Sequence, residues 1–157
     1  MAQSAEDLAR ESIESYNAGD FDRLRSLLAD DFYEEELGTQ RRIDGADARV
    51  AAAQAWKRAF PDERGTITGM TTGGNTVAIE ITWEGTQSGP IATPDGQELP
   101  PSNKRITLKA VEVIDVEDGK LKALRHYFDL MTLLQQIEAM DHADVAIASR
   151  LHRASGG

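Results

Sequence analysis

The sequence predicts an α+β domain in which helices precede most of an antiparallel sheet. Up to Pro61 the apolar residues recur at helical spacing, whereas from Thr66 onward apolar and polar residues alternate with a period of two. The turn sequences Gly73-Gly74-Asn75 and Glu117-Asp118-Gly119 separate the alternating runs, as is typical of antiparallel hairpins. Together these patterns predict a helical first half and a sheet-forming second half.

The first two predicted helices form a hairpin. Ser4 can cap the first helix, and the run Asn17-Ala18-Gly19 stops it. Asp20 can then cap a shorter second helix, in which Phe21 and Leu24 recur at helical spacing.

A third helix is predicted at about 46–60. The segment 32–37 looks extended and leads to this helix through a turn-rich link, and Pro61 ends it. The helix should present Trp56 and Phe60 to a core.

Four long strands are predicted in the second half. Thr66 to Thr72 pairs with Thr76 to Thr86 in one hairpin, and Lys104 to Val116 pairs with Leu121 to Phe128 in another. The segment between them, Gln87 to Asn103, contains four prolines and is therefore expected to be a loop without regular strand. Loops of this length often cover a binding site.

The C-terminal part should contain a short helix at about Leu130 to Met140. Residues 141–157 are weakly amphipathic, so we expect a helical or frayed tail there. A length of 157 residues fits one hydrophobic core, which predicts a single domain over 1–157.

The composition excludes several classes of function. The chain has 17 Lys and Arg against 27 Asp and Glu, and the net charge of -10 should repel nucleic acids and anionic membranes. There is no cysteine, which excludes thiolate nucleophiles and thiolate metal sites. Because no secretory signal or membrane-spanning run is visible, we expect a cytoplasmic protein.

Short sequence features follow one another in a recognisable order. They are Ala18-Gly19-Asp20-Phe21, Asp30-Asp31-Phe32, Trp56-Lys57-Arg58-Ala59-Phe60-Pro61-Asp62, Trp83-Glu84-Gly85-Thr86, Pro100-Pro101-Ser102-Asn103-Lys104, Val116-Glu117-Asp118-Gly119-Lys120, and Asp129 followed by Leu133-Leu134-Gln135-Gln136. In this order and spacing the chain resembles the SnoaL-like polyketide cyclases of the nuclear transport factor 2-like superfamily. The resemblance implies a cone-shaped fold, with three N-terminal helices packed in a strongly curved antiparallel sheet around a buried pocket and a short C-terminal helix. It also implies a homodimer formed through the outer face of the sheet.

Asp129 is the first candidate catalytic residue. The resemblance places it where the family's acid/base aspartate lies, and that aspartate moves a proton in an intramolecular aldol closure. Such a role needs a carboxylate in a largely apolar pocket, where desolvation raises its pKa. The alternative is that Asp129 only caps the helix that begins at Leu130.

His126 is the second candidate, because imidazole transfers protons near neutral pH. Alternation along the strand puts His126 and Asp129 on opposite faces, so both can face a pocket only through a bulge. Arg125 and Tyr127 share the face of Asp129 and could orient it or bind an enolate. Alternatively, His126 is a hydrogen-bonded structural histidine, Arg125 an ordinary surface arginine and Tyr127 a core tyrosine.

Glu35 is the third candidate. It lies in the run Glu34-Glu35-Glu36, and only one parity of this run can point inward. Glu35 falls where the related ketosteroid isomerases carry their catalytic aspartate, and Tyr33 has the same parity and could be its hydrogen-bond partner. Three adjacent acids could instead form a solvated strand edge.

The aromatic residues Trp56, Phe60 and Trp83 could line a pocket for a planar hydrophobic ligand, although they could equally be ordinary core. Gln87 stands where many relatives carry a histidine after Gly-Thr, and it could bind substrate by hydrogen bonds. Glu112 lies on an otherwise apolar strand face and could be a buried acid or a paired or dimer-facing glutamate.

We expect no metal and no cofactor, since His142 and His152 lie in the tail without a convincing third ligand. The resemblance implies a cofactor-independent enzyme acting on a small hydrophobic carbonyl compound. Its reaction would be an aldol-type cyclisation or a proton-shift isomerisation, with hydrolysis as a further option. The alternative is a non-catalytic module of the same fold that binds a small molecule or serves as a dimeric scaffold.

Overall fold

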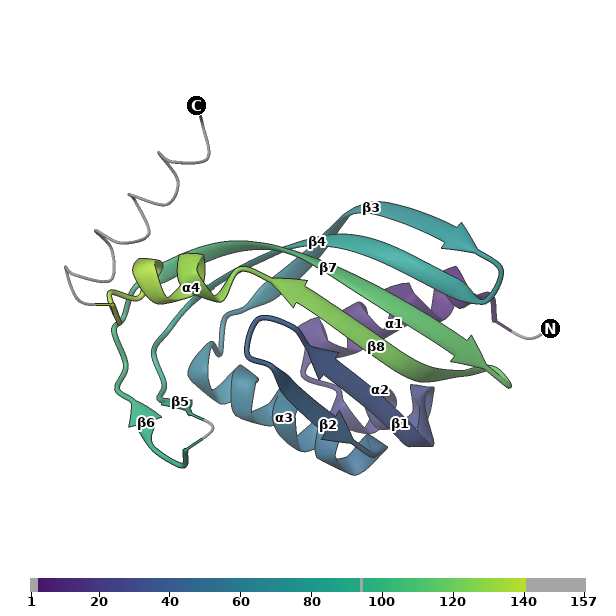
Figure 1. Cartoon of the computed structure of the whole chain (residues 1–157), viewed down its shortest axis with the longest axis horizontal. Coiled ribbons are helices and arrows are strands. Elements are labelled where there is room, and N and C mark those ends of the chain that lie inside the picture. The colour runs from purple at the N-terminus through teal and green to yellow at the C-terminus, as the bar shows by residue number, and fades with distance from the viewer. Residues whose placement is uncertain (1–2, 94, 141–157) are drawn as a thin grey trace.

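A computed structural model, which describes residues 3–93 and 95–140, contains a six-stranded sheet curved around three helices (Figure 1). Its strands are β1 (Leu28–Glu36), β2 (Arg41–Asp44), β3 (Arg64–Gly73), β4 (Thr76–Thr86), β7 (Arg105–Glu117) and β8 (Lys120–Phe128). They lie side by side in the order β2-β1-β8-β7-β4-β3. The predicted α+β architecture with a curved sheet is therefore confirmed.

One strand pair differs from the predicted antiparallel arrangement. β1 and β8 are parallel, with Glu34 beside Leu124 and Glu36 beside His126, whereas the other neighbouring strands of this sheet are antiparallel. Paired residues of these two strands are 90 or more positions apart in the chain, as Glu34 and Leu124 are. Alternation of side chains identifies each strand but carries no information about this long-range pairing.

The helices α1 (Ala5–Ala18), α2 (Phe21–Leu27) and α3 (Ala46–Ala59) cover one face of the sheet (Figure 1). Ser4 caps α1 in a capping box with Asp7, and the Asp20 side chain accepts a hydrogen bond from Arg23 N of 3.0 Å at the start of α2. The predicted caps of the helical hairpin are thus confirmed.

The hydrophobic core lies between these helices and the inner face of the sheet. Val77, Ile79 and Ile81 alternate along β4 and are at most 1% exposed. Their neighbours on β7 follow the same alternation, because Ile79 pairs with Glu112 and Ile81 with Ala110. β4 and β7 therefore each have one face buried against the helices, and their other face is outside the core.

The predicted loop from Gln87 to Asn103 contains a small hairpin, formed by β5 (Ile91–Ala92) and β6 (Glu98–Leu99). The prediction of no regular strand was therefore wrong for these four residues, although they form a small sheet separate from the main one. Ile91 and Leu99 are partly buried and pack against the core.

The last described helix, α4 (Leu130–Gln136), follows β8. It ends earlier than the predicted Met140, and Glu138 adopts a positive φ of 58° just after it. The predicted helical or frayed tail, 141–157, lies outside the described residues. Among the described helices, none is both long and apolar enough to cross a membrane.

Candidate functional site

A cavity of about 430 Å³ lies between the inner face of the sheet and helices α1 to α3. Apolar side chains from both layers and from α4 line most of it, and Ile91 and Leu99 of the 87–103 segment also line it. This size is in the range of small-molecule sites, which are mostly apolar with a few polar groups. We therefore take this cavity as the candidate functional site.

One polar cluster in the cavity combines His126 with two buried glutamates. His126 Nδ1 lies 3.8 Å from Glu34 Oε1, and Nε2 lies 4.0 Å from Glu112 Oε1. The glutamate side chains are only 3% and 4% exposed, and His126 Nε2 has no hydrogen-bond partner. These groups come from the adjacent strands β1, β8 and β7, whose inward-facing residues meet at this point.

Burial sets the protonation of this cluster. It lowers the pKa of His126, although Glu112 opposes the shift, so the imidazole is neutral at pH 7. Burial also raises the pKa of Glu112, which has no Lys or Arg within ion-pair distance among the described residues. The cluster thus contains a neutral imidazole beside a carboxyl group that holds its proton more strongly than usual.

Arg49 of α3 neutralises the other glutamate. Its Nε lies 2.6 Å from Glu34 Oε2, and the two side chains are 18% and 3% exposed. The two opposite charges form an ion pair, although Oε2 has no partner in hydrogen-bond geometry. Burial raises the pKa of Glu34 while the Arg49 guanidinium opposes that shift. A charge pair this deep exists only because each partner compensates the other.

A second polar cluster surrounds Glu63, which is 3% exposed and also lines the cavity. Its carboxylate accepts hydrogen bonds from Tyr16 Oη (2.6 Å) and Trp56 Nε1 (3.0 Å). Burial nevertheless raises the pKa of Glu63 to about 7, because desolvation outweighs these hydrogen bonds. The cavity therefore carries a second polar cluster besides that of His126, and Glu36, Thr39 and Arg41, joined by hydrogen bonds, also line it.

Asp129 does not line this cavity, contrary to the expectation of a pocket aspartate. It is exposed on the outer face of the sheet and caps α4, accepting hydrogen bonds from Met131 N (3.0 Å), Thr132 N (3.2 Å) and Thr132 Oγ1 (2.7 Å). The Thr132 hydroxyl and the backbone hydrogen bonds lower its pKa. Its position follows from strand alternation, which puts His126 inward and Asp129 outward without a bulge.

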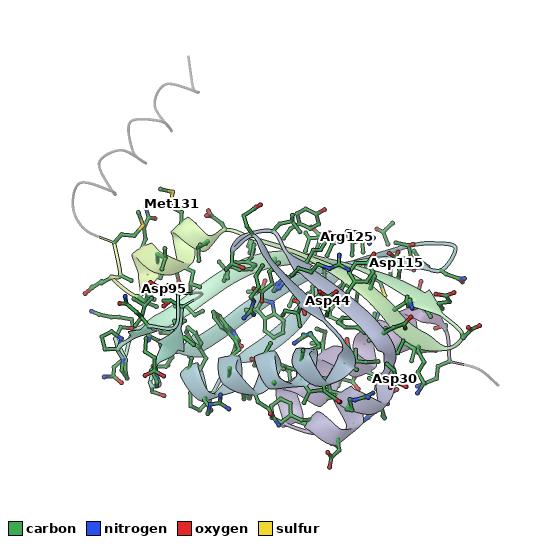
Figure 2. The ribbon with its side chains drawn as sticks, turned by 60° about the horizontal axis from the view of Figure 1, so that its bottom comes forward. Asp30, Asp44, Asp95, Asp115, Arg125 and Met131 are labelled. Carbon is green, nitrogen blue, oxygen red and sulfur yellow. The ribbon has the colours of Figure 1, made fainter. Side chains whose placement is uncertain are left out.

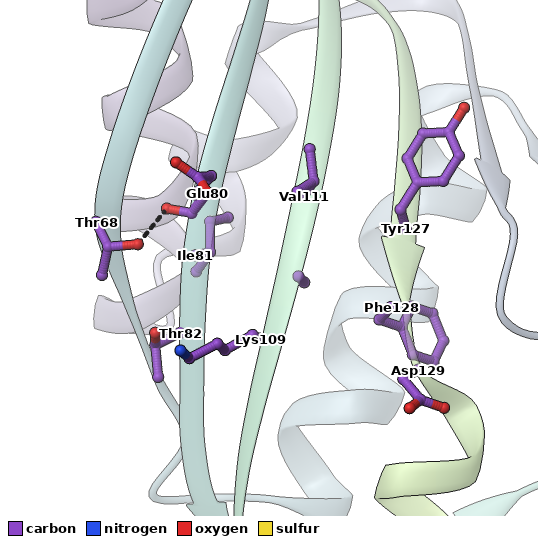
Figure 3. Close-up of a pocket in the computed structure, with 10 residues that line it drawn as sticks. Thr68, Glu80, Ile81, Thr82, Lys109, Val111, Tyr127, Phe128 and Asp129 are labelled. Carbon is purple, nitrogen blue, oxygen red and sulfur yellow. Dashed lines mark hydrogen bonds between the residues drawn. The ribbon is translucent and has the colours of Figure 1, made fainter. Parts of the chain in front are cut away.

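Tyr127 and Arg125 share the face of Asp129, as predicted, but that face is the outer one. Tyr127 is 46% exposed and borders a shallow depression with Asp129 and Val111 (Figure 3). Arg125 donates to Asp115 at 2.6 and 3.3 Å beside it (Figure 2). Neither residue reaches the cavity, so the expected contact with substrate there is wrong.

Glu35 and Tyr33 also lie on the outer face. Glu35 is 43% exposed and lies 3.3 Å from Arg42, whose guanidinium is 4.2 Å from the centre of the Tyr33 ring. The expectation that Glu35 faces the pocket is wrong, because the opposite parity of β1 points inward. Phe32, which is 1% exposed, has that parity and brings Glu34 with it.

Of the remaining predicted binding residues, Trp56 and Trp83 line the cavity, whereas Phe60 and Gln87 do not. Phe60 is fully buried and packs on Trp56, with ring centroids 4.9 Å apart. Gln87 is buried and holds the two ends of the 87–103 segment together. Its side chain donates to Gly89 O and Pro100 O at 3.1 and 3.0 Å and accepts from Ser102 N at 3.1 Å.

No three His, Asp or Glu side chains within 3–93 and 95–140 gather as a metal site would require. His142 and His152 lie outside the described residues.

Three charged residues of the two clusters around His126 and Glu63 were not predicted as site residues from the sequence. Arg49 had a signal, because it lies three residues after Ala46 and four before Ala53 on the buried face of α3. Glu34 had one too, since it shares the parity of Phe32. Glu63 had none, because it lies between Pro61 and the start of β3, where no periodic pattern applies.

Comparisons with known proteins agree with this architecture. The sequence model of the family "SnoaL-like polyketide cyclase" matches residues 6–137. No curated protein sequence matches the chain.

Several solved structures are similar. A SnoaL-like protein from Jannaschia sp. CCS1 has 19% identity and a TM-score of 0.77, covering 87% of this chain and 93% of that one. IdmH from Streptomyces antibioticus has 24% identity and a TM-score of 0.72, with 87% and 99% covered. A protein of ketosteroid isomerase-like fold from Catenulispora acidiphila has 14% identity and a TM-score of 0.70, with 84% and 92% covered. At these identities the similarity establishes the nuclear transport factor 2-like fold.

Proposed function

Because the chain belongs to the SnoaL-like polyketide cyclase family, we propose that it is a cofactor-independent enzyme that closes a ring in a small hydrophobic carbonyl compound by an aldol-type reaction. The observation that carries the proposal is the neutral His126 in an apolar cavity, with an unpartnered Nε2 and a buried carboxyl group 4.0 Å away. We assign no acid/base role to Asp129 or Glu35, since neither lines the cavity.

In this mechanism His126 removes a proton from a carbon next to a substrate carbonyl group, which leaves an enolate and an imidazolium. The enolate carbon then attacks a second carbonyl carbon of the same molecule, so that a carbon–carbon bond forms and that oxygen becomes an alkoxide. The alkoxide takes a proton from the imidazolium, and His126 returns to its neutral form. In its ionised form Glu112 stabilises the transient imidazolium, because its charge opposes the lowering of the His126 pKa. The apolar side chains that line the cavity, among them Ile91 and Leu99, limit the access of water.

Exchange of carbon-bound protons tests the first step without knowledge of the natural substrate. The C2 protons of 1-tetralone should exchange for deuterium in D₂O faster with the protein than without it, as followed by ¹H NMR. His126→Asn should lower this rate by a factor of roughly 100 or more, the usual range for a general base. Asp129→Asn, on the outer face, is the matched control and should leave the rate unchanged.

Two results would contradict the assignment. If Asp129→Asn abolished exchange while His126→Asn did not, the acid/base group would be on the outer face. If 1-tetralone bound without any accelerated exchange, the alternative of a non-catalytic binding module would be favoured instead.

We further propose that two copies of the chain pair through the outer face of the sheet. Tyr127, which is 46% exposed, lies on this face, and Met131, the other large hydrophobic side chain exposed among the described residues, belongs to α4. Light scattering on a size-exclusion column should give the mass of a dimer, and Tyr127→Glu should shift it toward the monomer. A monomeric wild-type protein at micromolar concentration would refute this pairing.

A further inference from the structure

Trp83 is held in a fixed position against the cavity. Its ring is 8% exposed and meets the Tyr16 ring edge-on, with centroids 5.3 Å apart and planes at 84°. On the other side it packs on Gly65, its partner across β3 and β4, where a Cβ atom would come within 2.5 Å of the indole. The side chain of Asn17 holds the backbone of Gly65, because its Nδ2 donates to Gly65 O (2.9 Å) and its Oδ1 accepts from Gly65 N (2.8 Å). The indole therefore has little freedom to turn.

The indole N–H of Trp83 is nevertheless left without an acceptor. Its Nε1 is buried and has no hydrogen-bond partner, although the residue lines the cavity. The second cavity tryptophan, Trp56, differs, because its Nε1 donates to Glu63 at 3.0 Å. A buried donor without an acceptor is unfavourable, and in a ligand site the acceptor is commonly supplied by the ligand.

Trp83 and His126 lie at different parts of the same cavity. Trp83 pairs with Leu108 on β7, and His126 pairs with Glu112 on the same strand, four residues further along. Four residues of strand span roughly 13 Å. Leu108 lies on the same apolar wall of the cavity. The two residues whose ring nitrogens have no partner are thus about four strand residues apart along the cavity, a separation that fused rings can span.

We propose that Trp83 Nε1 donates a hydrogen bond to a carbonyl or hydroxyl oxygen of the ligand, at the end remote from His126. The cavity would thereby select an elongated fused-ring compound with oxygen atoms near both ends, and Trp83 would be a specificity-determining residue. This inference rests on the proposed function in one respect, namely that the cavity binds a small hydrophobic carbonyl compound. It does not require that His126 act as a base.

Nuclear magnetic resonance tests the hydrogen bond directly, because the chain has only two tryptophans and hence two indole N–H signals. Trp83→Phe identifies the Trp83 signal by its disappearance. Two probes are compared, 6-hydroxy-1-tetralone, which has an oxygen at either end, and tetralin, which has none. The ketone should shift the Trp83 signal downfield, whereas tetralin should not, and the Trp56 signal serves as the internal reference.

Affinity gives a second readout. Trp83→Phe should weaken the binding of 6-hydroxy-1-tetralone about fivefold, the effect of one ordinary hydrogen bond, and leave tetralin almost unchanged. Equal weakening of both probes, or no ketone-specific shift of the Trp83 signal, would overturn the proposal. So would the failure of both probes to bind at millimolar concentration.

His126→Asn separates this inference from the catalytic proposal. The variant should lose proton exchange but keep the downfield shift of the Trp83 signal. Exchange that survived in His126→Asn would refute the catalytic role of His126 alone. A missing Trp83 shift in the wild-type protein would refute the hydrogen bond alone.

Discussion

Replacing Glu63 by glutamine should change how the stability of the protein depends on pH. Glu63 is 3% exposed, and burial raises its pKa from 4.5 to about 7 in the folded protein. Between these two values the folded state binds more protons than the unfolded state, so the free energy of unfolding falls as the pH rises. The difference between the two pKa values corresponds to about 3 kcal/mol of stability lost by pH 8.

Glutamine cannot ionise, so Glu63→Gln should remove this loss. Relative to wild type, the variant should gain about 3 kcal/mol in free energy of unfolding between pH 4.5 and pH 8. If Tyr16 and Trp56 donate weaker hydrogen bonds to the glutamine amide, the free energy of unfolding of the variant falls by the same amount at every pH, so the pH dependence of the difference from wild type is unchanged. Urea unfolding followed by circular dichroism at half-unit pH steps measures this difference. The other buried acids are common to both proteins and cancel in the comparison.

Asp129→Asn is the matched control. Hydrogen bonds from Thr132 lower the pKa of Asp129, so it contributes stability above its ordinary pKa of 3.8, which is lost only at more acidic pH. Its difference from wild type should therefore stay flat between pH 5 and pH 8. If the free-energy difference between Glu63→Gln and wild type were also constant between pH 5 and pH 8, the pKa of Glu63 would not be raised. The burial of its carboxyl group would then be refuted.

Three further substitutions test the buried ion pair, the packing against Trp83 and the cap of α4. Arg49→Met should lower the free energy of unfolding, measured with urea, by roughly 3–5 kcal/mol, because the buried Glu34 carboxylate loses its cation. A loss below about 1 kcal/mol would mean that Glu34 is neutral in the absence of Arg49. Gly65→Ala places a Cβ atom 2.5 Å from Trp83 and should cost about 1–3 kcal/mol by overpacking. Gly73→Ala, with nothing within 4 Å of its Cβ atom, should not show this packing loss, and equal melting temperatures for the two alanine variants would refute the clash. Asp129→Ala should cost about 1 kcal/mol as a lost helix cap, with proton exchange unchanged, and a loss of exchange would contradict its placement.

Local patterns were sufficient for the helices, the long strands and the family, but they missed the short strands β2, β5 and β6. Period-two alternation identified the long strands, and Ser4 and Asp20 marked the starts of the first two helices, as the structure has them. These features depend on side chains a few residues apart, which the sequence displays directly. The parallel pairing of β1 with β8 could not be predicted in this way, since the two strands are far apart in the sequence.

The candidate site was predicted only in part. His126, Trp56 and Trp83 were expected to line a pocket and do so, whereas Asp129 and Glu35 do not. Alternation says which residues share a face of a strand but not which face turns inward. In β1 both parities carry an aromatic residue and a glutamate, so this choice depended on packing.

The sequence by itself determined the order of the helices and long strands, the caps of the first two helices, the acidic charge and membership of the SnoaL-like family. Only the tertiary structure decided which acids are buried, because burial depends on the layers that strands and helices form together. The docking of α3 against β1 brings Arg49 to Glu34, and the pairing of β7 with β8 brings Glu112 to His126. The unusual pKa values of this cavity arise from that desolvation, which no local pattern contains.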